Sequence, residues 1–138
     1  MTPEQARSRF MAARVAYLAT ADAHGAPHLV PITFAVEEDR IYTAVDAKPK
    51  HGGRLKRLEN IAVNARVSVL VDHYDADWSR LWWARGDGLA SVLADGAGLH
   101  HALELLRARY PQYAETALAG PAIMVRVDRW SGWAADSG

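Results

Sequence analysis

The chain has 138 residues, with 16 lysines and arginines against 16 aspartates and glutamates, and it contains no cysteine. This length predicts a single domain over residues 1–138. The zero net charge excludes a protein that binds polyanions over its whole surface, and the lack of cysteine excludes disulfides, thiolate zinc sites and a cysteine nucleophile. No apolar stretch approaches the ~20 residues of a membrane span, and the N-terminus does not resemble a signal peptide. We therefore expect a soluble cytoplasmic protein.

The first half of the chain predicts one short helix and three strands. Thr2 is a suitable N-cap, Pro3 suits the first helical position, and Gln5 completes a capping box. Strands are predicted where apolar residues alternate between polar turns, over residues 15–20, 28–36 and 40–45. Pro31 lacks a backbone N–H, which favours an edge position for the second of these strands.

The second half predicts two more helices, over residues 54–64 and 99–109, and three more strands, over residues 67–74, 81–93 and 123–130. Gly86 and Gly88 interrupt the longest strand and indicate a β-bulge or a bend. Six mostly antiparallel strands with short helices between them predict a mainly β, α+β fold. Its architecture would be a six-stranded antiparallel barrel with short peripheral helices.

The basic residues are unevenly distributed along the chain, although the net charge is zero. All three lysines lie between residues 48 and 56, and Arg54 and Arg57 join them. Gly52 and Gly53 precede the predicted helix, so its first backbone N–H groups are accessible to an anion. A phosphate-binding site is one interpretation, and a solvated basic loop is the other. The spacing is not that of a P-loop, and a nucleic-acid site is disfavoured because the basic run contains no aromatic residue for base stacking.

The five tryptophans fall into two groups, Trp78, Trp82 and Trp83 in one and Trp130 and Trp133 in the other. In a strand, Trp82 and Trp83 would point to opposite faces, so that one packs inward and the other outward. The outward tryptophan could contact a planar ligand or a second subunit, although packing in the core is an equally good interpretation for any one of them. The histidines are not spaced as metal ligands, and we predict no metal site.

Several segments of the chain resemble the pyridoxamine 5′-phosphate oxidase-like split β-barrel superfamily. They are Tyr42-Thr43-Ala44, the pair Lys48 and Lys50, the helix from Arg54 to Ile61, and the strand from Arg66 to Val71. Residues 13–16, 71–74, 77–78 and 129–133 are most similar to an actinobacterial branch described as probable F420-dependent oxidoreductases. The resemblance extends from Arg14 to Trp133, which is nearly the whole chain.

This resemblance implies a homodimer of six-stranded split barrels, with two flavin-type cofactors in clefts between the subunits. By the family pattern, Lys48 and Lys50 would bind the cofactor phosphate, Arg54 would lie nearby, and Gly52 and Gly53 would offer backbone N–H groups where many relatives have a hydroxyl residue. Two strand segments would line the cofactor ring, namely Pro31-Ile32-Thr33 and Tyr42-Thr43. Trp82 or Trp83 would come from the partner subunit.

Two departures from the family pattern favour coenzyme F420 over FMN and argue against vitamin B6 oxidation. A glutamine used by FMN-dependent members is replaced near Leu81, and the C-terminal Arg-Leu-x-Pro pattern of the true oxidases is absent. The resemblance then implies hydride transfer between the deazaflavin and an unsaturated small organic substrate, with Tyr42, His51 and His73 as candidate proton donors. An FMN-binding oxidoreductase, or a carrier of flavin, haem or a tetrapyrrole without catalytic activity, is the alternative.

Overall fold

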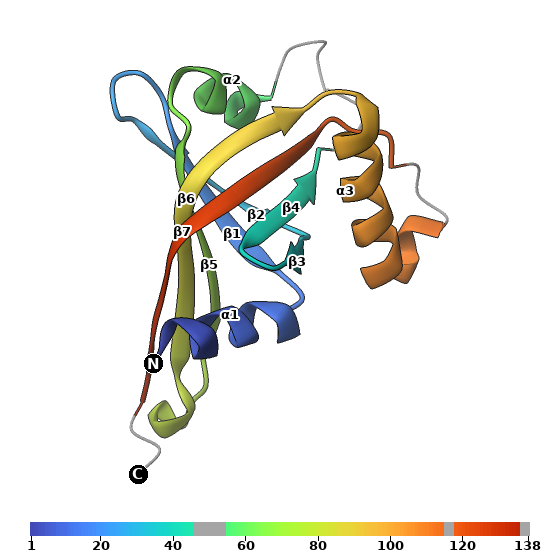
Figure 1. The fold of residues 1–138 in the computed structure, drawn as a ribbon. Helices are drawn as coiled ribbons and strands as arrows, with labels where there is room; N and C mark the ends of the chain where they lie inside the picture. The colour runs from blue at the N-terminus through green and yellow to red at the C-terminus, as the bar shows by residue number, and fades with distance from the viewer. Residues whose placement is uncertain (46–54, 115–117, 136–138) are drawn as a thin grey trace.

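A computed structural model of the protein describes residues 1–45, 55–114 and 118–135. These residues form a mostly β structure with three α-helices and seven strands (Figure 1). The helices are α1 (Pro3–Ala12), α2 (Lys56–Val63) and α3 (Gly96–Arg109), with short 3₁₀ helices η2 (Trp78–Arg80) and η3 (Pro111–Ala114). The strands are β1 (Ala16–Ala21), β2 (Pro27–Ile32), β3 (Ala35–Glu37), β4 (Arg40–Ala44), β5 (Arg66–His73), β6 (Trp82–Leu93) and β7 (Ala122–Ala134).

The first helix begins as its sequence predicts. The Thr2 side chain accepts a hydrogen bond from the backbone N–H of Gln5, and the Gln5 side chain accepts one from the backbone N–H of Thr2. This capping box satisfies two N–H groups that a helix start would otherwise leave without partners. Ala6 and Phe10 are fully buried, so α1 turns one face to the core of the sheet.

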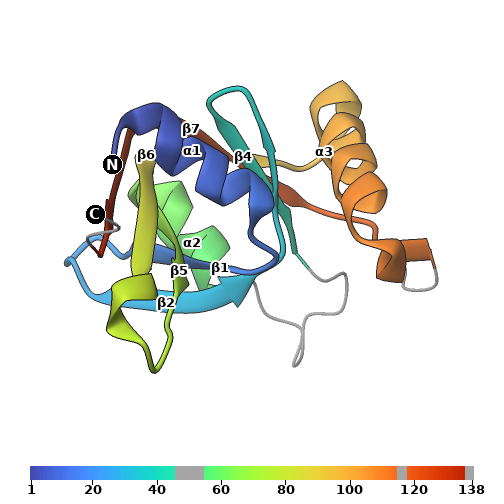
Figure 2. The same cartoon turned by 90° about the horizontal axis from the view of Figure 1, so that it is seen from below.

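All seven strands belong to one antiparallel sheet in the order β2-β1-β5-β6-β7-β4-β3. The strands β2 and β3 lie at opposite edges of this sheet, yet only Thr33 and Phe34 separate them in the chain. The sheet therefore has to curl until its two edges nearly meet, which gives a half-barrel (Figure 2). The position of Pro31 on an edge strand confirms that prediction.

The prediction of six strands is wrong by one. The segment 28–36, predicted as a single strand, divides into β2, which pairs with β1, and β3, which pairs with β4. At the break, the backbone N–H of Phe34 donates to the hydroxyl of Tyr110, 3.0 Å away, instead of to a neighbouring strand. The chain changes partners there because a side chain from outside the sheet satisfies the backbone group.

The predicted bulge is confirmed in β6. The register between β6 and β7 shifts between Asp87 and Gly88. At Gly88 the two strands approach so closely that a Cβ atom would collide with the carbonyl oxygen of Arg126. Glycine is therefore required at this position by the close approach of the backbones.

The main core lies inside the curl of the sheet. Phe10 of α1 packs edge-on against Phe34 and Trp130, with ring centroids 5.8 and 5.1 Å apart. The helix α2 lies towards the other end and contributes Leu58 and Ile61 to the same core (Figure 1). The helix α3 packs on the outside of the half-barrel, against β3 and β4, where it forms two smaller apolar clusters.

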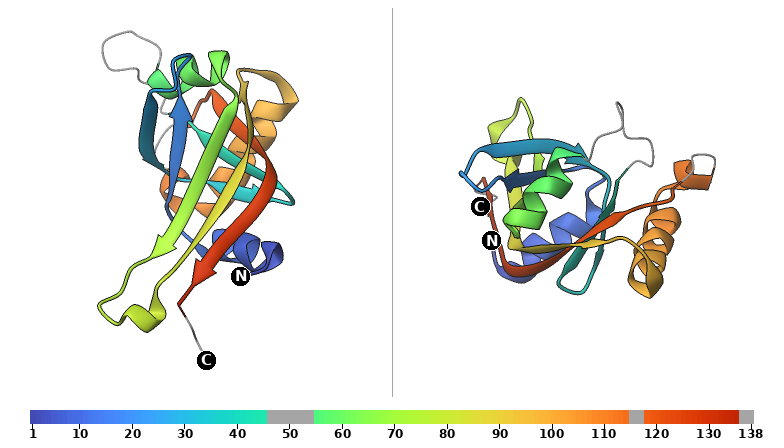
Figure 3. Two further views of the ribbon diagram at one scale, coloured as in Figure 1. Left: turned by 90° about the vertical axis from the view of Figure 1, so that its left-hand side faces the viewer. Right: turned by 90° about the horizontal axis from the view of Figure 1, so that it is seen from above.

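One end of the sheet projects beyond α1. We call this part the arm; it comprises residues 72–83 and 131–135, at the junction of β5, η2 and β6 and at the end of β7 (Figure 3). Its exposed aromatic residues include Tyr74, Trp78 and Trp133. None of the helices in the described part of the chain is long and apolar enough to cross a membrane.

Candidate functional site

The predicted phosphate-binding segment connects β4 to α2. Lys48, Lys50, Gly52, Gly53 and Arg54 lie outside the described residues, so their role remains a prediction. The described residues on either side pack against the core: Val45 is buried after β4, and Leu55 is partly buried before α2. The chain therefore leaves and re-enters the described structure at the wall of the half-barrel.

The helix α2 carries Arg57, the last cation of the basic run that the sequence analysis interpreted as a phosphate-binding site. Arg57 is half-buried, and its Nε atom has no hydrogen-bond partner among the described residues. Burial lowers the pKa of its guanidinium group. A half-buried cation of this kind is stabilised by an anion beside it.

The side chains of Pro31, Ile32 and Thr33 point to different surroundings. Pro31 is exposed, whereas Ile32 is buried in the main core. Thr33 lines a pocket. The strand around these residues can therefore line a ligand through Thr33 without any rearrangement of the core.

This pocket has a volume of about 630 Å³ and lies between the end of β2 and the region after α3; we call it the Thr33 pocket. Its lining residues are Arg14, Thr33, Tyr110, Pro111, Gln112 and Tyr113. The Thr33 Oγ1 and Tyr113 Oη atoms are 2.6 Å apart and share a hydrogen bond in which either can be the donor. The pocket thus combines an apolar wall with a hydroxyl pair, which is typical of small-molecule sites.

The walls of the Thr33 pocket are tied together by two residues at the end of α3. The Tyr110 hydroxyl donates to the Arg14 carbonyl oxygen at 2.9 Å and accepts from the Phe34 N–H. The Arg109 guanidinium donates to the carbonyl oxygens of Phe34 and Ala13 and lies 4.5 Å from the centroid of the Phe34 ring. These bonds join α1, α3 and the β2–β3 connection, so the pocket is preorganised.

Burial is the main cause that lowers the pKa of Arg109, with a smaller effect in the same direction from Arg14 and an opposing one from Tyr110. The carbonyl oxygens around Arg109 satisfy its donors without a carboxylate. Arg109 therefore has a structural function beside the pocket.

The predicted ring-lining pair Tyr42 and Thr43 is almost completely buried in β4. Tyr42 faces α3, where it packs with Ala102 and Ala122 and meets the His101 ring edge-on at 5.8 Å. The side chains of these two residues are therefore not brought to the Thr33 pocket. Their predicted contact with a cofactor remains a prediction.

The two adjacent tryptophans point to opposite faces of the arm, as predicted. Trp82 packs partly against the main core and lies beneath Arg9 of α1, whose Cζ atom is 4.7 Å from its ring centroid. Trp83 pairs across the strands with Trp133 on one side and Asp72 on the other. Trp83 is the one of the two that lies on the outer face of the sheet.

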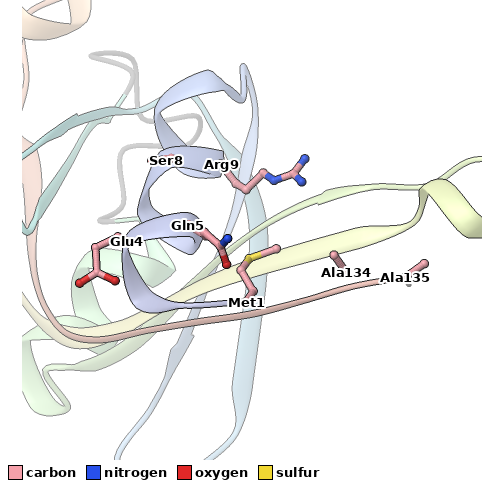
Figure 4. Close-up of a pocket in the computed structure, with 7 residues that line it drawn as sticks. All are labelled: Met1, Glu4, Gln5, Ser8, Arg9, Ala134 and Ala135. Carbon is pink, nitrogen blue, oxygen red and sulfur yellow. The ribbon is translucent and has the colours of Figure 1, made fainter. Parts of the chain in front are cut away.

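A second hollow runs between α1 and the arm, and we call it the α1–arm groove. Figure 4 shows the first of its two pockets, which we call the upper pocket, with Met1, Gln5 and Arg9 on the side of α1 nearest to Ala134. The upper pocket has a volume of about 530 Å³. An adjoining pocket of about 390 Å³, which we call the lower pocket, shares Arg9, Ala134 and Ala135 with it. No sequence motif indicated this groove, because α1 and β7 are brought together only by the fold.

Three histidines that could suggest a metal each pair with a different carboxylate. His100 pairs with Glu104, His101 pairs with Glu37, and His73 lies near Asp75 on the arm. Within residues 1–45, 55–114 and 118–135, no three potential ligands converge on a metal position.

Comparison with known proteins identifies the protein family. A family model described as pyridoxamine 5′-phosphate oxidase matches residues 2–134, and the chain therefore belongs to this family. A segment of 55 residues is 40% identical to a 5a,11a-dehydrotetracycline/5a,11a-dehydrooxytetracycline reductase of Streptomyces rimosus. This segment covers 40% of the chain and only 37% of the length of that reductase.

Solved structures share the whole fold at low sequence identity. A FAD-binding protein of Mesorhizobium loti is 22% identical, with a TM-score of 0.75 over 96% of this chain and 94% of that one. A conserved hypothetical protein of Mycobacterium tuberculosis is 21% identical, with a TM-score of 0.77 over 98% and 86%. A haem-binding protein of Mycobacterium smegmatis is 18% identical, with a TM-score of 0.75 over 99% and 55%.

Proposed function

We propose that the protein is an oxidoreductase that uses coenzyme F420 to transfer a hydride to an unsaturated small organic substrate. Membership of the pyridoxamine 5′-phosphate oxidase family and the partial match to a reductase support an oxidoreductase. The observation that carries the proposal is the Thr33 pocket, which combines space for a small molecule with a hydroxyl pair at its wall.

The residues present suit a phosphorylated cofactor. In this proposal Lys48, Lys50 and Arg54 bind the phosphate, with the backbone N–H groups of Gly52 and Gly53 beside them. Arg57 supports it from the described structure, because its half-buried guanidinium has a donor without a partner among residues 1–45, 55–114 and 118–135. Charge-assisted hydrogen bonds contribute about 1.5–3 kcal/mol each, so two or three are enough to anchor a phosphate.

When bound, the deazaflavin would supply the hydride, and the remaining chemistry would fall to this chain. Reduction of a double bond also requires a proton, and we assign its source to the Tyr113 hydroxyl. Thr33 holds that hydroxyl at 2.6 Å in the pocket. Two candidates suggested by sequence are less well placed, because Tyr42 is buried against α3 and His73 lies on the arm. The third, His51, lies outside the described residues.

The proposal includes a homodimer with the cofactor clefts between subunits. Exposed apolar side chains support it. Val15 lies just before β1, Tyr17 on β1, Leu29 on β2 and Trp133 on the arm. Between the two candidate tryptophans, we propose that Trp83 reaches the partner subunit. Trp82 is instead covered by Arg9 and packed against its own core.

A binding protein without catalytic activity is the second candidate. The solved structures of similar fold include proteins named for binding FAD and haem, which favours a flavin or haem ligand in the same family fold. Titration of the purified protein with F420, FMN, FAD and haemin, followed by absorbance and fluorescence, separates the candidates. The proposal requires F420 to bind most tightly and reduced F420 to be oxidised by a conjugated enone or quinone. Tight binding with no turnover of any acceptor favours a carrier, and retention of FMN through purification favours the FMN-dependent enzyme.

The phosphate assignment has its own test. Lys50→Ala should weaken F420 binding about ten- to a hundredfold, because it removes one charge-assisted contact. Arg66→Ala is the control: Arg66 is exposed at the start of β5, outside the predicted segment, and pairs with Asp128 at 3.1 Å. Fluorescence titration measures both variants. An unchanged affinity of Lys50→Ala would remove Lys50 from the phosphate site.

A further inference from the structure

The α1–arm groove has no part in the proposed function. Its two adjoining pockets, of about 530 and 390 Å³, have the size of small-molecule sites. They meet at Arg9, Ala134 and Ala135, and the short side chains of the two alanines leave the space above the end of β7 open (Figure 4). The groove is therefore continuous from the start of α1 to the inner face of the arm.

The guanidinium of Arg9 is fixed at the middle of this groove. Its Cζ atom lies 4.7 Å from the centroid of the Trp82 ring, and the His73 ring stacks with the same tryptophan at 6.4 Å and 20°. The aromatic face attracts the cation, which favours this position of the guanidinium. Its planar fork of N–H donors matches the two oxygens of a carboxylate.

The charges around Arg9 leave an excess of positive charge. Arg80 lines the same pocket, and its Nε atom is 3.8 Å from Asp75, whose carboxylate also lies 3.3 Å from His73 Nε2. None of the ion pairs in the described part of the chain includes Arg9. Glu4 belongs to the groove's upper lining, but Figure 4 shows its carboxylate pointing away from Arg9. Asp75 thus faces Arg80 and His73, and Arg9 has no ion-pair partner among the described residues.

Apolar side chains stand beside these cations. Leu81, Ala134 and the accessible part of Trp82 form an uncharged surface in the lower pocket. A ligand that complements both features carries one negative charge at one end and a flat apolar body at the other. We infer that the α1–arm groove binds a small aryl carboxylate, with its carboxylate on Arg9 and Arg80 and its ring against this apolar surface.

Calorimetric titration with 2-naphthoate tests the inference, with the neutral 2-naphthamide as the matched ligand. The wild-type protein should bind the acid, and the amide about tenfold more weakly, because the amide lacks the charge that Arg9 recognises. Arg9→Gln should weaken binding of the acid by about the same factor. Arg9→Lys keeps the charge without the bidentate fork and should fall between wild type and Arg9→Gln.

Two control variants locate the binding. Arg40→Gln removes an exposed arginine on β4, outside the groove, and should leave the affinity for naphthoate unchanged. Lys50→Ala, which tests the cofactor phosphate, should also leave it unchanged. Failure of the wild type to bind, equal affinity for acid and amide, or equal affinity of wild type and Arg9→Gln would each overturn the inference. A loss in Lys50→Ala but not in Arg9→Gln would place the acid in the cofactor site and overturn it as well.

Discussion

The two long strands β6 and β7 are covered in one part of their length and exposed in the other. Within the half-barrel, Ala84, Ile123 and Val125 are buried between the sheet and its helices. In the arm, Trp133 at the end of the same sheet is 48% exposed, and Trp78 and Tyr74 beside it are 69% and 73% exposed. A continuous hydrogen-bonded ladder therefore links a region that stabilises the fold to one whose side chains remain available for binding.

Aromatic residues have different functions in these two regions. Phe10, Phe34 and Trp130 form a close-packed set of edge-on contacts inside the half-barrel. On the arm, Trp82 and Trp83 instead contact arginines, Arg9 and Arg85, at 4.7 and 5.5 Å from their ring centroids. Substitutions should therefore affect the free energy of unfolding in the first region and binding in the second.

The largest effect is expected from Phe34→Ala. This side chain is fully buried and packs against Phe10 and Arg109, so its removal leaves a cavity and should lower the free energy of unfolding by about 3–5 kcal/mol. Trp78→Ala removes a larger but exposed ring and should change the free energy of unfolding by less than about 0.5 kcal/mol. Denaturant unfolding measures both, and a similar loss in the two variants would show that the arm also stabilises the fold.

Tyr110→Phe should have an intermediate effect. It removes the hydroxyl that accepts from the Phe34 N–H and donates to the Arg14 carbonyl, and it leaves buried backbone groups without a partner. We expect a loss of about 1–3 kcal/mol in the free energy of unfolding. Tyr113→Phe, which removes a hydroxyl from a less buried position, is the matched variant and should cost less. Equal losses would mean that Tyr110 does not link the walls of the pocket.

The smallest expected effect is on the stability of the proposed homodimer. Trp133→Ser exchanges an exposed arm residue paired with Trp83 for a small polar one, and it should weaken the proposed homodimer about tenfold without lowering the melting temperature of the subunit. Sedimentation over a concentration series measures the dissociation constant. Leu29→Ser, on the exposed surface of the edge strand β2, is a second variant with the same expected direction. A monomeric wild-type protein, or no change in either variant, would contradict the proposed interface.

Much of the fold could be predicted because its signals are local. The capping box at Thr2 and the bulge near Gly88 depend on residues close together in the chain, and both are confirmed. The break between β2 and β3 was missed because its cause, the Tyr110 hydroxyl, lies 76 residues away in sequence. The strand β7 also continues to Ala134, beyond the predicted end at Trp130, because Trp133 pairs with Trp83 across the sheet.

The candidate site was less predictable than the fold. Thr33 was singled out, but its hydroxyl partner Tyr113 follows Pro111, where the last predicted helix ends, and no motif marks it. The family pattern named Pro31 and Ile32 but gave no direction for their side chains, and neither residue belongs to the lining of the Thr33 pocket. Arg9 and Trp82 meet only because α1 crosses the sheet, which no sequence spacing indicates.

The place of β7 in the sheet also has a consequence for synthesis of the protein. Although β7 is the last of the described strands, it lies between β6 and β4 and pairs with both. Until residues 122–134 leave the ribosome, β6 and β4 each present an unpaired edge, and the hairpin of β3 and β4 has no attachment to the rest of the sheet. Such edges invite pairing with other chains. The half-barrel therefore cannot complete its sheet before β7 has been synthesised, and nascent chains stalled before β7 should be prone to aggregation.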